Sequence, residues 1–236
     1  MTAVPATVEI DRPLGVGELL AVALRIFSGR AWTFIGLGVL QAGALVAAAF
    51  TPIAAAVAIL AAAFTVAFAM AARLLAGDSL AQALPKTARS APVLLPLGLV
   101  VAVPFYLGSA WLLSLIFAIG WLALTGFAIP VAMIEDAGNP TWSGRVLHAL
   151  RRTLALARAQ YLHAIGVAAA LVVIYVLVGV VLTLALNSFA DNGRVAAQAL
   201  AQIVLAPFFF IGLGVLYFEQ SARALGSTGP PPSGRA

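Results

Sequence analysis

The stretch Ala91–Ile134 reads APVLLPLGLVVAVPFYLGSAWLLSLIFAIGWLALTGFAIPVAMI and decides the fold class. No Asp, Glu, Lys, Arg or His occurs in the 45 residues from Ser90 to Ile134. One helix of that length would be about 67 Å long at roughly 1.5 Å per residue, whereas the hydrocarbon core of a bilayer is about 30 Å thick. The stretch therefore predicts two membrane-spanning helices that turn back at Gly108-Ser109.

The rest of the chain has the same character. Only 9% of its 236 residues are charged and 63% are apolar, whereas a soluble domain carries about 25% charged residues. Three further runs without Asp, Glu, Lys or Arg cover residues 31–72, 159–190 and 195–218. By length these runs hold two, one and one spans. With the two spans of Ala91–Ile134, six are expected in all. Runs this long indicate helices and not barrel strands.

The predicted architecture is an all-α integral membrane domain. Six transmembrane helices form three hairpins, and an amphipathic helix at the cytoplasmic face precedes each hairpin. The domain covers residues 14–225, between a flexible lead (1–13) and a disordered Pro/Gly/Ser-rich tail (226–236). The spans are expected at about 32–50, 53–72, 92–107, 111–134, 164–186 and 200–218.

Residues 15–28, 79–89 and 143–160 show amphipathic helical periodicity. Asp78 is expected to cap the second of these helices at its amino end. The three segments begin about 64 residues apart, which indicates three units of one helix plus one hairpin. Because the units match poorly residue by residue, true triplication and a merely shared architecture both remain open.

Basic residues predict the orientation, since cytoplasmic loops are enriched in Lys and Arg. With the amino terminus in the cytoplasm, Arg194 alone falls outside. Both termini are therefore expected to be cytoplasmic, and the net charge of +5 reflects topology and not affinity for nucleic acid. The twelve inside are Arg12, Arg25, Arg30, Arg73, Lys86, Arg89, Arg145, Arg151, Arg152, Arg158, Arg223 and Arg235.

The third amphipathic helix is the most basic and leads to a functional prediction. Its polar side chains are expected to contact anionic lipid headgroups or a protein partner. The candidate contacts are Arg145, His148, Arg151, Arg152 and Arg158. Glu135, which follows span 4, is expected to reach an arginine of this helix, and Glu219 to pair with Arg223 one helical turn later. These acids are interpreted as structural clamps, and recognition of a headgroup amine is the alternative.

Prolines within the spans suggest a second hypothesis. Pro96 and Pro104 fall in span 3, Pro130 in span 4 and Pro207 in span 6. Broken helices can expose backbone groups to a ligand at membrane depth, so a transporter or export subunit using these spans is the alternative function. Ordinary kinks are the simpler interpretation of the same prolines.

Residues with catalytic spacing are absent from the sequence. It contains no HExxH, GxSxG, Walker or EF-hand pattern and no cysteine, so no enzyme activity, metal or cofactor is expected. His148 and His163 have no carboxylate close by in sequence and are interpreted as interfacial histidines. No Asp, Glu, Lys or Arg lies at mid-depth in any span. Gln198 and Gln202, one turn apart, are interpreted as contacts between helices, with a substrate site as the alternative.

Three short stretches resemble a known family. They are Leu14–Leu20, Pro130–Glu135 with the following basic helix that contains Arg152, Thr153 and Arg158, and Tyr217–Glu219 with Arg223. Together they are similar to the family named for the membrane domain of glycerophosphodiester phosphodiesterases, across residues 14–225.

The resemblance implies a stand-alone six-span protein of the bacterial inner membrane with no assigned activity. The closing signature of that family carries two arginines, and Ser221 occupies the first of these positions here. The phosphodiesterase itself is a separate barrel domain with metal-binding carboxylates and paired histidines. No soluble segment here is long enough for that barrel, so hydrolysis is not expected.

Overall fold

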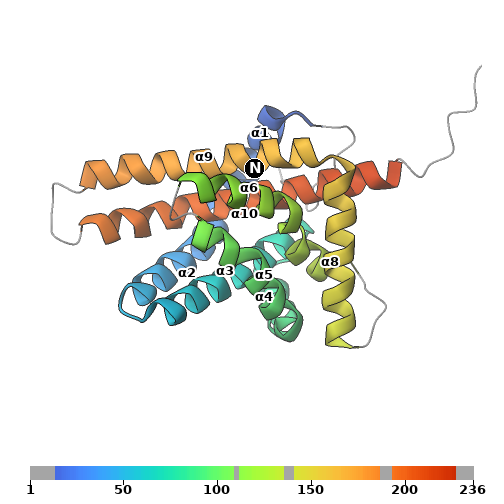
Figure 1. Ribbon diagram of the computed structural model, residues 1–236, viewed down its shortest axis with the longest axis horizontal. Coiled ribbons are helices and arrows are strands. Elements are labelled where there is room, and N and C mark those ends of the chain that lie inside the picture. Colours follow the sequence, from blue (N-terminus) through green and yellow to red (C-terminus); the bar gives the residue numbers. More distant parts are fainter. Residues whose placement is uncertain (1–13, 109–111, 136–140, 187–192, 227–236) are drawn as a thin grey trace, which may run out of the picture.

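The computed structural model describes residues 14–108, 112–135, 141–186 and 193–226, and within them it contains ten helices and no strand (Figure 1). The predicted lead, the tail beyond Gly226 and the turn at Ser109 lie outside the described residues. The helices are α1 (Val16–Gly29), α2 (Ala31–Ala49), α3 (Ile53–Leu75), α4 (Leu80–Arg89), α5 (Ala91–Gly108), α6 (Leu112–Thr125), α7 (Ala128–Ile134), α8 (Trp142–Ala159), α9 (Tyr161–Leu186) and α10 (Gly193–Gly226).

Five helical segments are long and apolar enough to cross a membrane. They are Ala31–Ala49, Ile53–Leu75, Leu115–Ile134, Tyr161–Ala185 and Ala196–Ala224. Helices α4 and α5 meet the same criterion only as a pair, across a bend of 85° at Ser90, and this pair would make a sixth. The prediction of an all-helical chain with several spans is therefore confirmed at the level of five to six.

The predicted fourth span is not one helix. Helix α6 ends at Thr125 and α7 begins at Ala128. The two residues between them, 126 and 127, lie four and three positions before Pro130. Proline has no amide hydrogen, and its ring clashes with the carbonyl four residues earlier, here that of Gly126. The short α7 that follows is buried over most of its length.

The other three prolines do not break their helices. Helix α5 continues through Pro96 and Pro104, and α10 continues through Pro207. Because proline has no amide hydrogen, the backbone carbonyl four residues before each of them loses its helical hydrogen bond. A neighbouring helix comes close to two of these carbonyls. The indole Nε1 of Trp121 donates to the Val100 carbonyl, four residues before Pro104, at 2.8 Å. The structure thus places three of the candidate helix breaks, Pro96, Pro104 and Pro207, inside continuous helices. At Pro104 a neighbouring helix satisfies the freed backbone carbonyl.

The second of these carbonyls, in α10, lies against a glycine of α2. The Ile203 carbonyl lies four residues before Pro207, and a Cβ built on Gly38 of α2 would be only 2.0 Å from its oxygen. A side chain at position 38 would therefore push α2 and α10 apart. Small residues that allow such close backbone approach are typical of helix packing in membranes.

An aromatic cluster joins α3 to α10 beside this contact. The ring of Phe210 lies 5.1 Å from that of Phe64 and 5.5 Å from that of Phe68, measured between centroids. All three side chains are buried. Edge-to-face and stacked aromatic pairs of this kind add to the energy of simple burial, so they reinforce the centre of the bundle.

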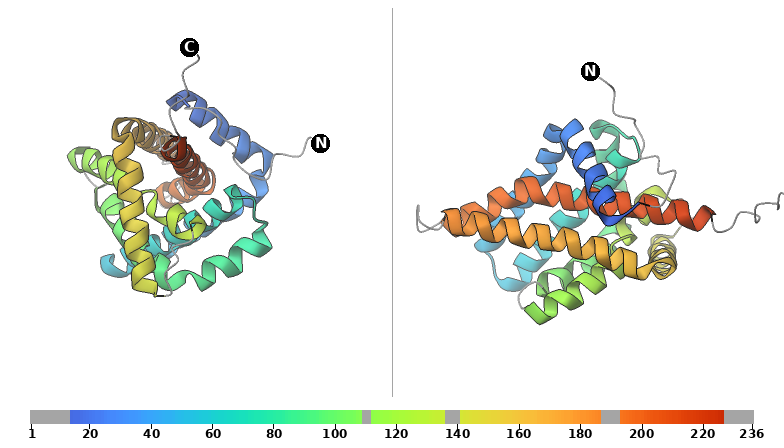
Figure 2. Two further views of the ribbon diagram at one scale, coloured as in Figure 1. Left: turned by 90° about the vertical axis from the view of Figure 1, so that its right-hand side faces the viewer. Right: turned by 90° about the horizontal axis from the view of Figure 1, so that it is seen from above.

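Helices α1, α4 and α8 occupy the three segments for which amphipathic helices are predicted. Helix α8 crosses the end of the bundle where α9 begins and α10 ends (Figure 1), and α1, α4 and α8 frame the end of α10 (Figure 2). The cap of α4 differs from the prediction. Ser79, not Asp78, occupies the N-cap position, because Asp78 is held by two cations instead.

Candidate functional site

Glu135 connects three helices at the end of the bundle where α8 lies. It directly follows α7, and its carboxylate accepts a hydrogen bond from Arg152 Nε of α8 at 3.1 Å. The same carboxylate accepts from the Tyr217 hydroxyl of α10, also at 3.1 Å. The expected contact between Glu135 and an arginine of the third polar helix is present. Tyr217, which residue spacing did not single out as its partner, lies 82 residues away in sequence.

Glu219, two residues after Tyr217 on α10, is the centre of a second group of polar contacts, or junction, between helices. Its side chain is completely buried and accepts from the Leu14 backbone amide at 2.7 Å. His163 Nε2 of α9 lies 3.0 Å from its other oxygen, and Arg223 pairs with it one turn later, as expected. A carboxylate buried this deeply requires such partners, since an unpaired charge away from water is costly.

His163 is therefore not simply an interfacial histidine without a carboxylate. Its partner Glu219 is 56 residues away, on the adjacent helix. No sequence pattern at short range could have revealed this pair, because it depends on how α9 and α10 align side by side. By contrast, His148 is half-buried, and its Nε2 has no hydrogen-bond partner in the described part of the chain.

The two junctions bring together the three stretches singled out in the sequence. Leu14 belongs to the first stretch, Glu135 and Arg152 to the second, and Tyr217 and Glu219 to the third. Each junction links the third stretch to one of the others. Residues that are up to 205 positions apart therefore form one polar layer at this end of the molecule.

A basic pocket lies beside Glu135. It has a volume of about 340 Å³ and lies between α4, α7 and α8. Four of its lining side chains are cationic: Arg73, Lys86, Arg89 and Arg145. The remaining lining residues are Ser90, Ala132, Met133, Ile134 and Glu135.

Two of these cations are already engaged. Arg73 donates from Nε to Asp78 at 2.5 Å and from Nη1 to the Met133 carbonyl near the end of α7 at 2.8 Å. Lys86 donates to the second oxygen of Asp78 at 2.8 Å. Arg89 and Arg145 have no ion pair within the described residues. The pocket thus presents two fixed and two available positive charges.

The titration of Asp78 reflects this arrangement. Burial by itself would raise the pKa of Asp78, but hydrogen bonds from Lys86 and Arg73, together with their charges, outweigh it. The pKa of Asp78 therefore lies below its ordinary value of 3.8. The carboxylate remains ionised at neutral pH and fixes both cations at the pocket wall.

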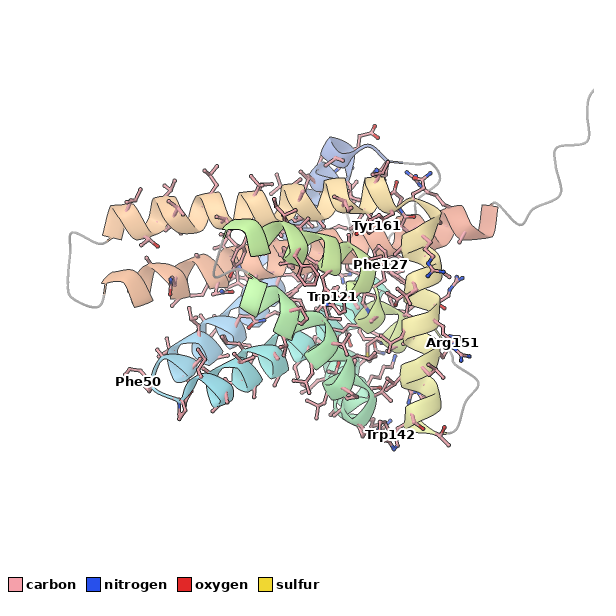
Figure 3. The ribbon with its side chains drawn as sticks, in the orientation of Figure 1. Phe50, Trp121, Phe127, Trp142, Arg151 and Tyr161 are labelled. Carbon is pink, nitrogen blue, oxygen red and sulfur yellow. The ribbon has the colours of Figure 1, made fainter. Side chains whose placement is uncertain are left out.

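The five predicted contacts on α8 lie in different surroundings. Arg145 lines the basic pocket, whereas Arg152 is engaged by Glu135. Arg151 and Arg158 are exposed, and Arg151 projects away from the bundle (Figure 3). The sequence-based set also omitted Arg73, Lys86 and Arg89, although the positive-inside count placed them on the same face.

A separate, mostly apolar cavity of about 410 Å³ opens between α9 and α10. Its lining also includes Leu45, Leu60 and Leu115 of α2, α3 and α6. A second, small pocket of about 20 Å³ has Tyr175 and Gln202 in common with this cavity and is also lined by Gln41; it is called the inner extension below. Gln202 donates to the Tyr175 hydroxyl, so the expected contact between helices at Gln202 exists. None of the four mid-span prolines lines the basic pocket, this cavity or its extension.

Among the described residues no group of three His, Cys, Asp or Glu side chains is placed to hold a metal ion. Comparison of the chain with family models, curated proteins and solved structures found no match in any of the three.

Proposed function

We propose that the chain is a multi-pass protein of the bacterial inner membrane with six spans in three hairpins and both termini in the cytoplasm. The distribution of Lys and Arg supports this orientation. The arrangement in space agrees with it, because Phe50, between α2 and α3, and Arg151 of α8 lie at opposite ends of the molecule (Figure 3). The pair α4–α5 supplies the sixth span, with α4 along the surface and α5 entering the membrane.

The function we propose is recognition of anionic phospholipid at the cytoplasmic face, without catalysis. The observation that carries it is the basic pocket, where Arg89 and Arg145 remain available beside Arg73 and Lys86. Guanidinium groups bind phosphate oxygens through paired hydrogen bonds. A phosphate at this pocket would complete the charge balance that Asp78 and Glu135 leave unfinished.

The phosphate, and not a headgroup amine, is the feature recognised. Glu135 is the acid that lines the pocket, and its carboxylate is occupied by Arg152 and Tyr217. It therefore serves to position α8 against α7 and α10. Phosphatidylglycerol or cardiolipin would fit this chemistry better than a zwitterionic lipid.

The test measures lipid retained by the purified protein in nanodiscs that contain phosphatidylglycerol or phosphatidylcholine. The double variant Arg89→Gln/Arg145→Gln is expected to weaken binding of phosphatidylglycerol roughly thirtyfold, at about 1 kcal/mol for each cation near the surface. The matched control is Arg151→Gln/Arg158→Gln, which removes the same charge from exposed positions on α8. A smaller effect is expected for the control.

Equal losses in the two double variants would show that only general surface charge attracts lipid, and the pocket assignment would be wrong. A wild-type protein that does not prefer phosphatidylglycerol would end the lipid proposal as a whole. In that case a protein partner at the cytoplasmic face would be the remaining hypothesis. It would be supported if both double variants abolished a complex that co-purifies with the wild type.

A transporter or export subunit is the alternative function. The cavity between α9 and α10 favours it, because its inner extension reaches residues deep in the bundle. The sequence suggested a transport site at the prolines of spans 3, 4 and 6. That version loses support, since these prolines do not line the cavity. Flux of a solute into proteoliposomes that is abolished by filling the cavity would favour this alternative over lipid binding.

Membership of the family of glycerophosphodiester phosphodiesterase membrane domains also stands as a proposal. Its support is spatial, because the three stretches on which the resemblance rests meet at Glu135 and Glu219. Their meeting gives these short motifs a common structural role, which is to tie α1, α7, α8 and α10 together.

A further inference from the structure

The cavity between α9 and α10 lies within the proposed hydrocarbon layer. Along one wall its lining includes Val176, Val180 and Leu184 of α9, which are among the exposed side chains of this helix. The cavity is therefore open toward the side of the bundle that would face lipid. Its volume of about 410 Å³ falls in the range of small-molecule sites, about 300–1,000 Å³.

The inner end of this cavity reaches the middle of the membrane. Gln41 is ten residues into α2, or about 15 Å along it at 1.5 Å per residue. Tyr175 is fourteen residues into α9, which corresponds to about 21 Å. Half of the hydrocarbon thickness is about 15 Å, so the polar groups at this end lie near mid-depth.

Gln41 is a buried polar residue that lines this part of the cavity and for which the described residues supply no hydrogen bond. Its side chain is 2% exposed, and the part of the cavity that it lines is the inner extension. An amide placed in hydrocarbon without a partner is costly. Its position at the wall of a cavity indicates that the partner is a ligand.

The neighbouring groups define the chemistry of that ligand. Gln202 donates to the Tyr175 hydroxyl oxygen, which leaves the hydroxyl proton of Tyr175 and the carbonyl oxygen of Gln202 available. Together with the Gln41 amide, these groups offer both donors and acceptors. No charged side chain lines the cavity or its extension, so an ionised headgroup would find no counter-charge.

We propose that this cavity binds an uncharged, single-chain membrane lipid whose polar group is one hydroxyl or carbonyl. The hydrocarbon chain occupies the apolar cavity between α9 and α10, and the polar group hydrogen-bonds to Gln41 and to the Tyr175–Gln202 pair. This site is distinct from the basic pocket in place, in charge and in ligand. It does not depend on the proposed binding of anionic phospholipid.

The experiment uses the purified protein in nanodiscs with three probes of equal chain length. The probes are a long-chain alcohol, the corresponding alkane and the corresponding fatty acid, each carrying the same photoreactive diazirine. After irradiation, the labelled peptides are identified by mass spectrometry. The alcohol is expected to label the cavity walls on α9 and α10 in preference to the alkane and the fatty acid.

Two variants test the two parts of the site. Gly179 lines the cavity, and a Cβ built there meets nothing within 4 Å, so Gly179→Phe is expected to fill the cavity and abolish labelling by the alcohol. The matched control is Gly36→Phe on α2, which also has open space at its Cβ and lines none of these cavities. This control is expected to label as the wild type does.

Gln41→Leu keeps the size of the side chain and removes the amide. It is expected to reduce the preference for alcohol over alkane about threefold, the effect of one hydrogen bond between groups in a membrane. This variant also tests the site if Gly179→Phe does not fold. Equal labelling by alcohol and alkane in the wild type, or an unchanged preference in Gln41→Leu, would overturn the proposal. Labelling of Gly179→Phe at the wild-type level would do the same.

Discussion

The indole of Trp121 donates to the backbone carbonyl of Val100 at 2.8 Å, and Val100 is the residue whose helical donor Pro104 cannot supply. A side chain of α6 therefore repairs the hydrogen bonding of α5 at the point where proline disturbs it. This contact explains why α5 continues through a residue that ends most helices.

We expect Trp121→Phe to lower the free energy of unfolding by about 1 kcal/mol through the lost hydrogen bond, in addition to any loss of packing. In a Pro104→Ala background the amide of residue 104 can again donate to Val100, so the same substitution should cost less. Thermal unfolding of the four proteins in detergent completes the cycle. An identical cost in both backgrounds would show that the indole does not compensate for the proline.

Gly38 and Gly36 form a matched pair on one helix. A Cβ on Gly38 would lie 2.0 Å from the Ile203 carbonyl oxygen, whereas a Cβ on Gly36 meets nothing within 4 Å. We predict that Gly38→Ala destabilises the protein by about 1–3 kcal/mol through overpacking. Gly36→Ala should be neutral or slightly stabilising, because alanine favours the helix. Similar unfolding temperatures for the two variants would contradict the close contact between α2 and α10.

The buried carboxylate of Glu219 should be the most sensitive position in the polar layer. Glu219→Gln leaves Arg223 without its counter-charge and removes the carboxylate that faces His163. Loss of one partner from a buried pair costs about 3–5 kcal/mol. Because the Leu14 amide also loses a charged acceptor, α1 should detach more readily. Trypsin is expected to cleave faster after the exposed Arg25.

His163→Gln provides the comparison for that variant. It removes one of the partners of Glu219 and leaves the amide and Arg223 in place, so its effect on stability and on cleavage after Arg25 should be smaller. If Glu219→Gln behaved like the wild type in both measurements, the junction would not hold α1 to the bundle.

The lowered pKa of Asp78 predicts a dependence of stability on acid pH. A carboxyl group whose pKa is lower in the folded state stabilises the fold above the pKa of the unfolded chain, about 3.9. That contribution is lost as the pH falls from there through the pKa of the folded state. Asp78→Asn should remove this part of the pH dependence between neutral pH and strongly acid pH, as followed by thermal unfolding. An unchanged profile would mean that the pairs with Arg73 and Lys86 add no stability.

The long apolar helices were predictable because a membrane span depends only on the length and the absence of charge of a segment. Lipid demands about 20 residues without charge, and the charge-free runs 31–72, 159–190 and 195–218 satisfy it directly. The interruption before Pro130 follows from proline chemistry. That Pro104 leaves α5 intact does not, because the outcome depends on Trp121, a residue from another helix.

The polar layer was predictable only where its partners are close in sequence or where charge limits the choice. Glu219 and Arg223 are one turn apart, and Glu135 had few cations within reach of the end of span 4. The pair of His163 with Glu219 and the bond of Tyr217 to Glu135 depend on the relative placement of α8, α9 and α10. The amide of Gln41 became informative only when the structure showed that it lines a cavity.

The contact between Leu14 and Glu219 also has a consequence for biogenesis. Glu219 is synthesised 205 residues after Leu14, so the Leu14 amide cannot reach this acceptor until the end of α10 has been made. The same carboxylate then receives His163 and Arg223. Closure of this junction therefore requires that α10 has been made through Glu219. A protein truncated before Glu219 would hold α1 only through apolar contacts such as those of the buried Leu19 and Ala23, so α1 should become more accessible to quality-control proteases.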